Sequence, residues 1–200
     1  VAGLKEASVP RSKKDCGIPA LPFVEGVADS PVARVPIVTS KWSRTDRLNA
    51  VRCRLSQFRM RYTVPPGLYA IGRPGASSEI FVSANYKLSF DILRRSLAGI
   101  NGWILVLDTS GINVWCAAGK GTFGTNELTG RILKTGLSEL VSNRAVIVPQ
   151  LGAPGIAAHE VEKRTGFKVV YGPVRAEDIK TFISAGLKAS GDMRTVKFTV

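Results

Sequence analysis

Residues 79–108 read EIFVSANYKLSFDILRRSLAGINGWILVLD, and this stretch decides the fold class. It contains two short apolar runs, EIFVSA at 79–84 and WILVLD at 103–108, on either side of an amphipathic helical pattern that Ser89 or Asp91 can cap. Strands that are apolar along their whole length and alternate with amphipathic helices form βαβ units with right-handed crossovers. The stretch therefore predicts parallel strands covered by helices.

The same alternation continues toward the C-terminus. Further β-rich runs are AVIVPQ at 145–150 and KVVYG at 168–172, and helical patterns lie near 126–143, 156–165 and 176–186. We therefore expect an α/β fold in which a Rossmann-like parallel sheet, flanked by helices, forms a core over residues 79–186.

The N-terminal part of the chain has a different pattern. Residues 1–33 contain scattered prolines and charges and predict an irregular leader. Residues 34–72 predict a β-rich entry, with strand-like runs at 34–39, 58–64 and 68–71. Residues 34–200 are thus expected to form one α/β domain with an N-terminal β-rich extension.

The chain is strongly basic, with 28 Lys and Arg against 15 Asp and Glu and a net charge of +13 at pH 7. The stretch from Arg44 to Tyr62 holds six arginines and one acid, and it includes the aromatic Phe58. Basic and aromatic residues in this mixture can bind nucleic acid. Because apolar residues alternate with arginines there, we favour a pair of strands with one solvated, arginine-rich face.

Three cysteines, Cys16, Cys53 and Cys116, are 37 and 63 residues apart. These spacings give no CxxC pair and no disulfide framework, so we expect no zinc site and no iron–sulfur cluster in this chain. Free cysteines are typical of a reducing cytoplasm. No run approaches the roughly 20 apolar residues of a membrane-spanning helix, and the N-terminus lacks a signal-peptide pattern.

A ligand site is expected where the carboxyl ends of the parallel strands meet, because ligands of such sheets bind at that edge. The loops there are rich in Gly, Pro, Asn and aromatic residues, and the longest follows 103–108. Asp108 begins this loop either as a ligand-facing carboxylate or as the cap of a turn. The other pocket residues expected at this edge are Asn85, Tyr86, Thr122, Phe123, Gly124, Gln150, Gly152, Tyr171 and Gly172.

Two other features at this edge are weak functional signals. Residues 119–124 fit GxGxxG, but they do not directly follow their strand, as a dinucleotide-binding loop does, and Lys120 is followed by Gly rather than the Ser or Thr of a P-loop. The lone histidine, His159, is better explained by a structural role at a helix terminus, since a zinc site needs several ligands.

Cys116 is the strongest single candidate for chemistry. It lies in NVWCAAGK, residues 113–120, where Asn113 can cap one helical turn. A helix N-terminus and the nearby Lys120 are both expected to lower the pKa of the thiol. The residues that follow are small enough for a broad planar ligand to approach: Ala117, Ala118 and Gly119. The alternative is that Cys116 is a buried small hydrophobe, as free cysteines often are.

NVWCAAGK resembles the signature of the corrinoid-binding protein of microbial mercury methylation. It is similar, more distantly, to the corrinoid domain in the large subunit of the corrinoid iron–sulfur protein of acetyl-CoA synthesis. The resemblance extends from about Arg34 to Phe198. It implies that Cys116 is the catalytic residue and the lower axial ligand of cobalt, on a short helix beneath the ring of cobalamin or a related corrinoid. The cofactor contacts that it implies are Asn113, Val114, Trp115, Cys116, Ala117, Ala118, Gly119 and Lys120.

The resemblance also implies a reaction. A thiolate is a soft, strongly donating ligand, so it should favour transfer of the methyl group as a carbanion equivalent to Hg(II), giving methylmercury. A methyltetrahydrofolate-linked donor would supply the methyl group, and a ferredoxin-like protein with two 4Fe–4S clusters would supply electrons. The family occurs in anaerobes, and its full-length proteins anchor this cytoplasmic domain to the inner membrane through a C-terminal membrane region absent from this chain.

Two further function classes stay open at this point. One is a methyl-carrying corrinoid protein of the acetyl-CoA pathway, which is similar in fold. The other is a basic, non-enzymatic module that binds RNA or an acidic partner. We favour the corrinoid-dependent methyltransferase and expect no nucleic-acid partner.

Overall fold

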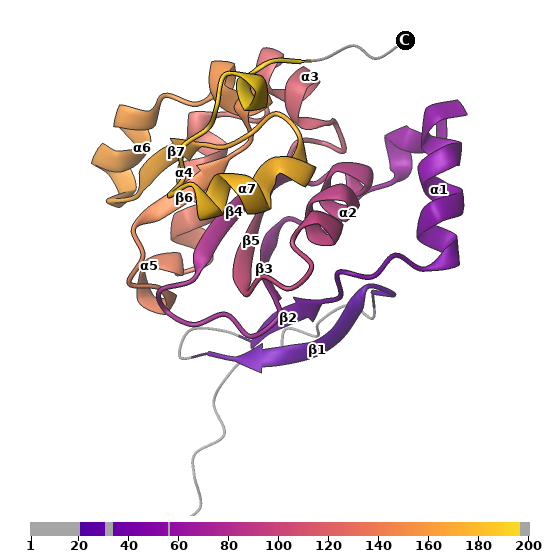
Figure 1. The fold of residues 1–200 in the computed structure, drawn as a ribbon, viewed down its shortest axis with the longest axis horizontal. Coiled ribbons are helices and arrows are strands. Elements are labelled where there is room, and N and C mark those ends of the chain that lie inside the picture. Colours follow the sequence, from indigo (N-terminus) through magenta and orange to yellow (C-terminus); the bar gives the residue numbers. More distant parts are fainter. Residues whose placement is uncertain (1–20, 31–33, 56, 197–200) are drawn as a thin grey trace, which may run out of the picture.

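The computed structural model describes residues 21–30, 34–55 and 57–196, and its strands form one seven-stranded sheet (Figure 1). The strand order is β1-β2-β3-β5-β4-β6-β7. The strands are β1 Val24–Asp29, β2 Arg34–Val38, β3 Gly67–Ile71, β4 Glu79–Ala84, β5 Gly102–Leu107, β6 Ala145–Val148 and β7 Lys168–Tyr171. The parallel core is confirmed for β4, β5, β6 and β7, whereas β3 pairs antiparallel with β5 and β1 pairs antiparallel with β2.

Helices cover both faces of this sheet, as Figure 1 shows. α2 and α7 lie on one face, and α3, α4, α5 and α6 lie on the other. The α-helices are α1 Arg44–Leu55, α2 Lys87–Ser96, α3 Val114–Gly119, α4 Thr125–Lys134, α5 Leu137–Leu140, α6 Ala158–Thr165 and α7 Ile179–Ser184. The 3₁₀ helices are η1 Gln57–Arg61, η2 Gln150–Gly155, η3 Ala176–Asp178 and η4 Asp192–Arg194.

β5 shows why the central strands are apolar along their whole length. All six of its residues are buried. Trp103 and Leu105 pack with the helices on the α4 side, and Ile104 and Val106 pack with those on the α2 side. Because successive side chains of a strand point to opposite faces, a strand covered on both sides has no polar face.

The predicted strand pair between Arg44 and Tyr62 is wrong, because these residues form α1 and η1. Ser43 and Asp46 start the helix with a capping box: the Asp46 carboxylate accepts from the Ser43 backbone N–H, and the Ser43 hydroxyl accepts from the Asp46 N–H. Only Ala50 and Cys53 of α1 are buried. These two side chains are three residues apart, so they lie on the same side of a helix and bury it there, although the residues around them alternate as in a strand. All six arginines are exposed, as the prediction of a solvated arginine-rich face requires.

Other expected boundaries also need correction. The irregular leader proposed for residues 1–33 is wrong over β1, and residues 1–20 lie outside the described residues. α2 begins at Lys87, before the two residues proposed to cap it. The helix expected over 126–143 is divided into α4 and α5 by Gly136, whose φ of 60° is left-handed. No helix in the described ranges is long and apolar enough to cross a membrane.

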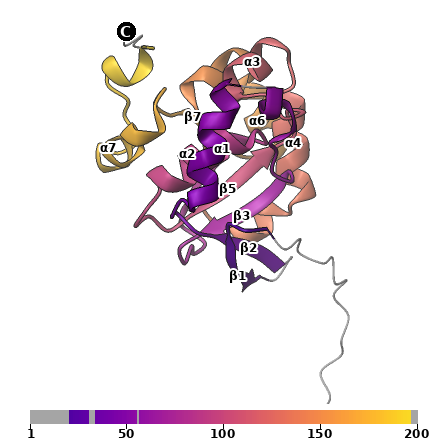
Figure 2. The ribbon, with the colours of Figure 1, turned by 90° about the vertical axis from the view of Figure 1, so that its right-hand side faces the viewer.

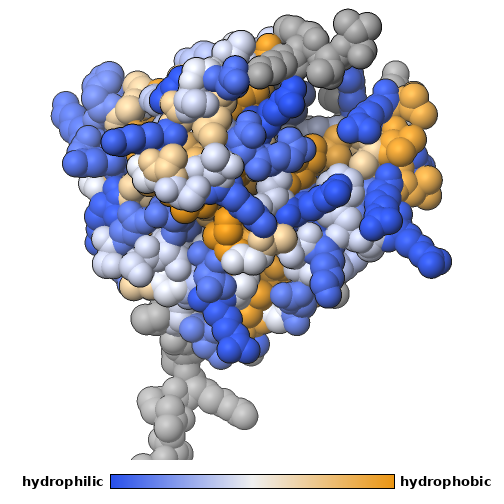
Figure 3. Space-filling model, in the orientation of Figure 1, coloured by the Kyte–Doolittle hydropathy of each residue, from blue (hydrophilic) through white to orange (hydrophobic). Residues whose placement is uncertain are grey.

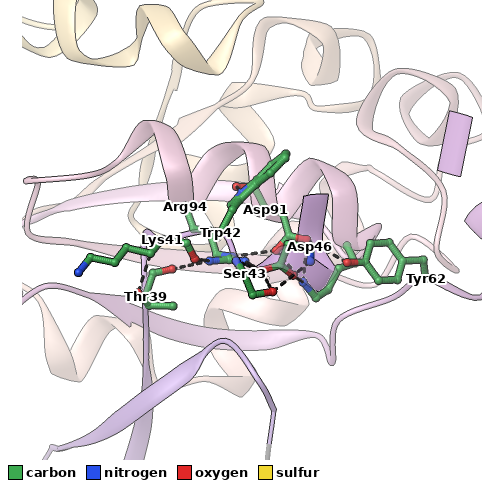
Figure 4. Close-up of polar contacts among 9 residues, drawn as sticks. Thr39, Lys41, Trp42, Ser43, Asp46, Tyr62, Asp91 and Arg94 are labelled. Atoms are coloured by element: carbon green, nitrogen blue, oxygen red, sulfur yellow. Dashed lines mark hydrogen bonds and ion pairs between the residues drawn. The ribbon is translucent and has the colours of Figure 1, made fainter. Parts of the chain in front are cut away.

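A buried cluster of charged side chains links α1 to α2 through ion pairs (Figure 4). It contains the two carboxylates Asp46 and Asp91 and the two cations Lys87 and Arg94. The Arg94 guanidinium is fully buried and bonds both carboxylates, at 2.9 Å to Asp46 Oδ2 and 2.7 Å to Asp91 Oδ1. It also donates to the carbonyl oxygens of Thr39 and Lys41. The four charges therefore balance within the protein interior, and the segment between β2 and α1 is fixed to them.

Asp46 makes the stability of this cluster depend on pH. Burial alone would raise the pKa of its carboxyl, but the hydrogen bonds from Ser43 and the charges of Lys87 and Arg94 together hold that pKa below its usual value of 3.8. A carboxyl with a lowered folded-state pKa stabilises the fold fully above its unfolded-state pKa, and this contribution disappears as the pH falls through the folded-state value.

We expect Asp46→Asn to lower the free energy of unfolding by about 1–3 kcal/mol at neutral pH, because Lys87 and Arg94 lose a charged partner. The loss of stability on acidification below pH 3.8 should be shallower in this variant than in the parent. Urea unfolding at a series of pH values measures both effects. The control is Asp29→Asn, which breaks an exposed ion pair with Arg34 and should change stability by under about 0.5 kcal/mol. Equal acid sensitivity of parent and Asp46→Asn would contradict the assignment.

Candidate functional site

The loop after β5 is held by the buried side chain of Asn85, at the end of β4. Its Oδ1 accepts hydrogen bonds from the backbone N–H groups of Thr109 at 3.1 Å and Gly111 at 2.9 Å, and from the Thr109 hydroxyl at 2.8 Å. Its Nδ2 lies 3.3 Å from Asp108 Oδ1, which also accepts from the Ser110 N–H. Asn85 and Asp108 therefore shape the turn that leads into α3, and Asp108 acts as a turn cap.

α3 presents Cys116 to solvent. The Asn113 side chain accepts a hydrogen bond from the Cys116 backbone N–H at 2.9 Å, so the predicted capped turn is confirmed. One side of the helix is buried through Val114 and Ala117. Cys116 is exposed, and the alternative that it is a buried small hydrophobe is wrong.

α3 lies directly against η2, and glycine makes this contact possible. A Cβ on Gly155 would lie 2.1 Å from the Phe123 carbonyl oxygen and 3.2 Å from Ala118 Cα. A Cβ on Gly152 would lie 2.4 Å from the Phe123 ring, which is fully buried. These two glycines therefore let η2 pack closely against α3 and the turn that follows it.

A cavity of about 330 Å³ opens beside the start of α3, at the strand-end edge where a ligand site was expected. Ser83 of β4, Pro149 after β6 and Gly172 after β7 form its strand-end side. Among the predicted residues, Asn113, Val114, Trp115 and Gly172 line it. Sequence reasoning missed the apolar residues that α2, η3 and α7 contribute, namely Ile92, Leu93, Ala176 and Ile179. The sequence indicates these residues only through the apolar positions of the helical patterns to which they belong.

Several predicted pocket residues instead hold the loops together. The Tyr171 hydroxyl donates to the Ile156 carbonyl at 2.8 Å, and Gln150 Oε1 accepts from Arg194 at 2.8 Å. The Thr122 hydroxyl lies 3.4 Å from the Ala117 carbonyl oxygen. Tyr86 precedes α2, and burial raises its pKa to about 12. The predicted residues outside the cavity lining are Asn85, Tyr86, Cys116, Ala117, Ala118, Gly119, Lys120, Thr122, Phe123, Gly124, Gln150, Gly152 and Tyr171, for which contact with a ligand stays a prediction. Ala117 and Ala118 are buried against the fold.

The two weak signals have structural explanations. Residues 119–124 connect α3 to α4 rather than a strand to a helix, so they lack the setting of a dinucleotide-binding loop. Gly121 has a φ of 79°, and a Cβ on Gly124 would lie 2.7 Å from the Gly121 oxygen, which explains Gly121 and Gly124. His159 is exposed in the first turn of α6. In the part of the chain that the structure describes, no three His, Cys, Asp or Glu side chains form a metal site.

Comparisons with known proteins give a consistent result. Residues 47–183 match the family model described as CO dehydrogenase/acetyl-CoA synthase delta subunit. The chain is 34% identical over 122 residues to the acetyl-CoA decarbonylase/synthase complex subunit gamma of Archaeoglobus fulgidus, covering 60% of this chain and 26% of that protein. It is 28% identical over 122 residues to the corrinoid/iron-sulfur protein large subunit of Moorella thermoacetica, covering 60% of this chain and 27% of that protein. The chain thus spans only about a quarter of each of these relatives.

The close contact between η2 and α3 gives a test of the local packing. We expect Gly155→Ala to lower the free energy of unfolding by about 1–3 kcal/mol, because the added methyl group meets backbone atoms of Phe123 and Ala118. Gly130→Ala is the control: its Cβ would meet no atom within 4 Å inside α4, and it should raise stability by about 0.5–1 kcal/mol. Urea denaturation measures both, and a neutral Gly155→Ala would show that η2 is free to shift.

Proposed function

The chain belongs to the CO dehydrogenase/acetyl-CoA synthase delta subunit family, and from this premise we propose that it is a corrinoid-binding domain that takes part in methyl transfer. Its relative in Moorella thermoacetica is named for a corrinoid. The observation that carries the proposal is the exposed Cys116 thiol on the capped first turn of α3, beside a cavity at the strand-end edge.

The residues of this edge fit a corrinoid. The exposed side of α3 carries Cys116 and Gly119, and a Cβ at Gly119 would meet nothing within 4 Å, so a planar ring has room to approach. The cavity next to Asn113 and Trp115 is lined largely by apolar side chains, and its size suits an arm or tail of the ligand rather than a whole corrin. When bound, a corrinoid would supply a cobalt ion that carries the methyl group, and a protein side chain could hold and tune that cobalt.

In this proposal Cys116 would hold the cobalt of the corrinoid through its sulfur. Its sulfur can be bound as a thiolate, which is a soft and strongly donating ligand. Asn113 fixes the backbone that carries the thiol, since its side chain is bonded to the Cys116 N–H. The Asn85 side chain holds the loop before α3 through bonds from the Thr109 and Gly111 backbone N–H groups, and this supports the position of the helix that carries Cys116.

Two methyl acceptors are candidates. The comparisons favour a methyl carrier of the acetyl-CoA pathway, because the relatives are named as subunits of acetyl-CoA-forming or -cleaving complexes. Hg(II) is the second candidate, and what supports it is the resemblance of NVWCAAGK, with its exposed cysteine on α3, to the mercury-methylating family. For either acceptor we propose a methyltetrahydrofolate-linked methyl donor, and for mercury a ferredoxin-like electron donor with two 4Fe–4S clusters.

The first test is spectroscopic. We expect the protein to bind cobalamin with its benzimidazole displaced from cobalt, and to show sulfur-to-cobalt charge-transfer absorption that is absent from Cys116→Ala. Cys53→Ala is the matched control, because it removes a buried cysteine of α1 and should leave the spectrum unchanged. Identical spectra for the parent and Cys116→Ala would refute axial ligation, while failure of both to bind any corrinoid would refute the cofactor assignment.

The second test concerns the chemistry of the ligand. Cys116→His replaces the anionic thiolate donor with a neutral imidazole at the same position. The amount of methylmercury formed per bound corrinoid should therefore fall about tenfold or more, which corresponds to a loss of about 1.4 kcal/mol of transition-state stabilisation. The assay compares both proteins in the full-length context, with the iron–sulfur partner present. Equal rates per corrinoid would show that Cys116 only docks the ring.

The same methylated protein decides between the acceptors. It is offered HgCl₂ in one reaction and an acetyl-CoA synthase with CO and coenzyme A in another. Methylmercury as the product supports the mercury assignment, and acetyl-CoA as the product supports the pathway to which the relatives belong.

A further inference from the structure

A groove of about 640 Å³ runs between α1, the outer side of α2 and the segment of η3 and α7. Figure 2 views the molecule from this side, with α1 in front of α2 and α7 to one side. The groove is lined by Trp42, Arg47, Ala50, Val51, Arg54, Ile92, Arg95, Ser96, Glu177 and Lys180. It is separate from the cavity beside α3, although Ile92 lines both.

The charged side chains that line the groove are mostly positive. It contains four cations, Arg47, Arg54, Arg95 and Lys180, and a single carboxylate, Glu177. Within residues 21–30, 34–55 and 57–196, no carboxylate lies within ion-pair distance of any of the four cations. The buried cluster of Asp46 and Asp91 is already neutralised by Lys87 and Arg94, so it does not offset this charge. The groove therefore has an uncompensated positive potential.

An exposed apolar row accompanies the charge. Leu48, Val51 and Leu55 of α1 are 60%, 49% and 80% exposed, and Val51 lies on the groove wall. Figure 3 shows the corresponding hydrophobic patch over α1, next to hydrophilic side chains. Their spacing of three and four residues places them on one side of the helix. Apolar side chains flanked by arginines are characteristic of protein–protein interfaces.

We propose that this groove and the apolar row of α1 form a docking surface for a protein that presents an acidic, partly apolar segment. A second copy of this chain is a poor occupant, because each copy carries a net charge of +13. Residues 1–20 of the chain carry four basic and two acidic residues, so they do not supply the complementary charge. Of these occupants, charge complementarity thus favours an acidic partner protein.

Nucleic acid fits the surface less well. Single strands are held mainly by stacking on free aromatic rings. The one aromatic side chain of the groove, Trp42, already donates its indole N–H to the Asp91 carbonyl and has the Arg95 guanidinium 5.1 Å from its ring centroid. An apolar row on α1 also has no role against a phosphate backbone.

The position of the surface gives it a functional consequence. Ile92 separates the groove from the cavity beside α3, and the neighbouring residues Ala176 and Glu177 line the cavity and the groove respectively. A partner docked on α1 would therefore lie beside the mouth of the candidate cofactor site. The docking itself is independent of what that site binds.

The test uses the full chain and a fluorescein-labelled peptide, EELLEELEELLEEL, as the probe. We expect binding that weakens with salt and about tenfold or more in Arg47→Glu/Arg54→Glu. The matched control is Lys134→Glu/Lys163→Glu, which removes the same charge from exposed positions of α4 and α6, on the other side of the sheet, and should weaken binding less than about twofold. Val51→Gln/Leu55→Gln keeps the charge and should also weaken binding, by about fivefold.

Each remaining outcome overturns the proposal. Equal loss in the two charge-reversed variants would mean that net charge alone attracts the peptide. Unchanged binding by Val51→Gln/Leu55→Gln, or by a peptide with serine in place of leucine, would remove the apolar row from the interface. Displacement of the probe by single-stranded poly(U) more effectively than by unlabelled peptide would identify a nucleic-acid surface instead.

Discussion

The side chain of Asn85 is the interaction on which the functional edge of the protein depends. One buried amide at the end of β4 accepts from two backbone N–H groups and a hydroxyl of the loop after β5, and its backbone carbonyl accepts from Val64 N–H at 2.9 Å. It therefore joins the central strand to the segment before β3 and to the loop that leads into α3. Because buried polar groups are costly when unpaired, these bonds leave the loop little conformational choice. The position of Cys116 therefore depends on the conformation of that loop.

The buried charges of α1 and α2 have a comparable organising role for the other side of the molecule. Burying four charged groups stabilises a fold little by itself, since desolvation offsets much of the attraction. What the cluster provides is geometry: Arg94 bonds carboxylates of two helices and two carbonyls of the segment between β2 and α1, which fixes how α1 packs on α2. With α1 fixed in this way, Arg47, Val51 and Arg54 line the groove, and Leu48 and Leu55 are exposed to solvent.

α2 lies between the two surfaces that we propose to be functional. One of its sides lines the cavity beside α3, and the other lines the basic groove, with Ile92 common to both. A cofactor held at Cys116 and an acidic partner held at α1 would therefore be neighbours. This arrangement suits a methyl-transfer domain that must meet other proteins, because recognition by charge then occurs next to the site of chemistry rather than across the molecule.

The sequence by itself determined the parallel strands, the helices between them and the capped turn of Cys116, because these depend on local periodicity and on one side-chain cap at fixed spacing. It also predicted the edge at which the cavity beside α3 opens. Only the tertiary structure decided the rest. The local pattern of α1 predicts strands, because arginines alternate with apolar residues there. Only the fold shows that Ala50 and Cys53 are the two side chains of α1 that are buried. Phe123, Gln150 and Tyr171, which we predict to line a pocket, each contact a segment distant in sequence: η2, η4 and the loop before α6. Contacts between segments that are distant in sequence determine where such side chains lie, and these contacts cannot be predicted from the spacing of residues along the chain.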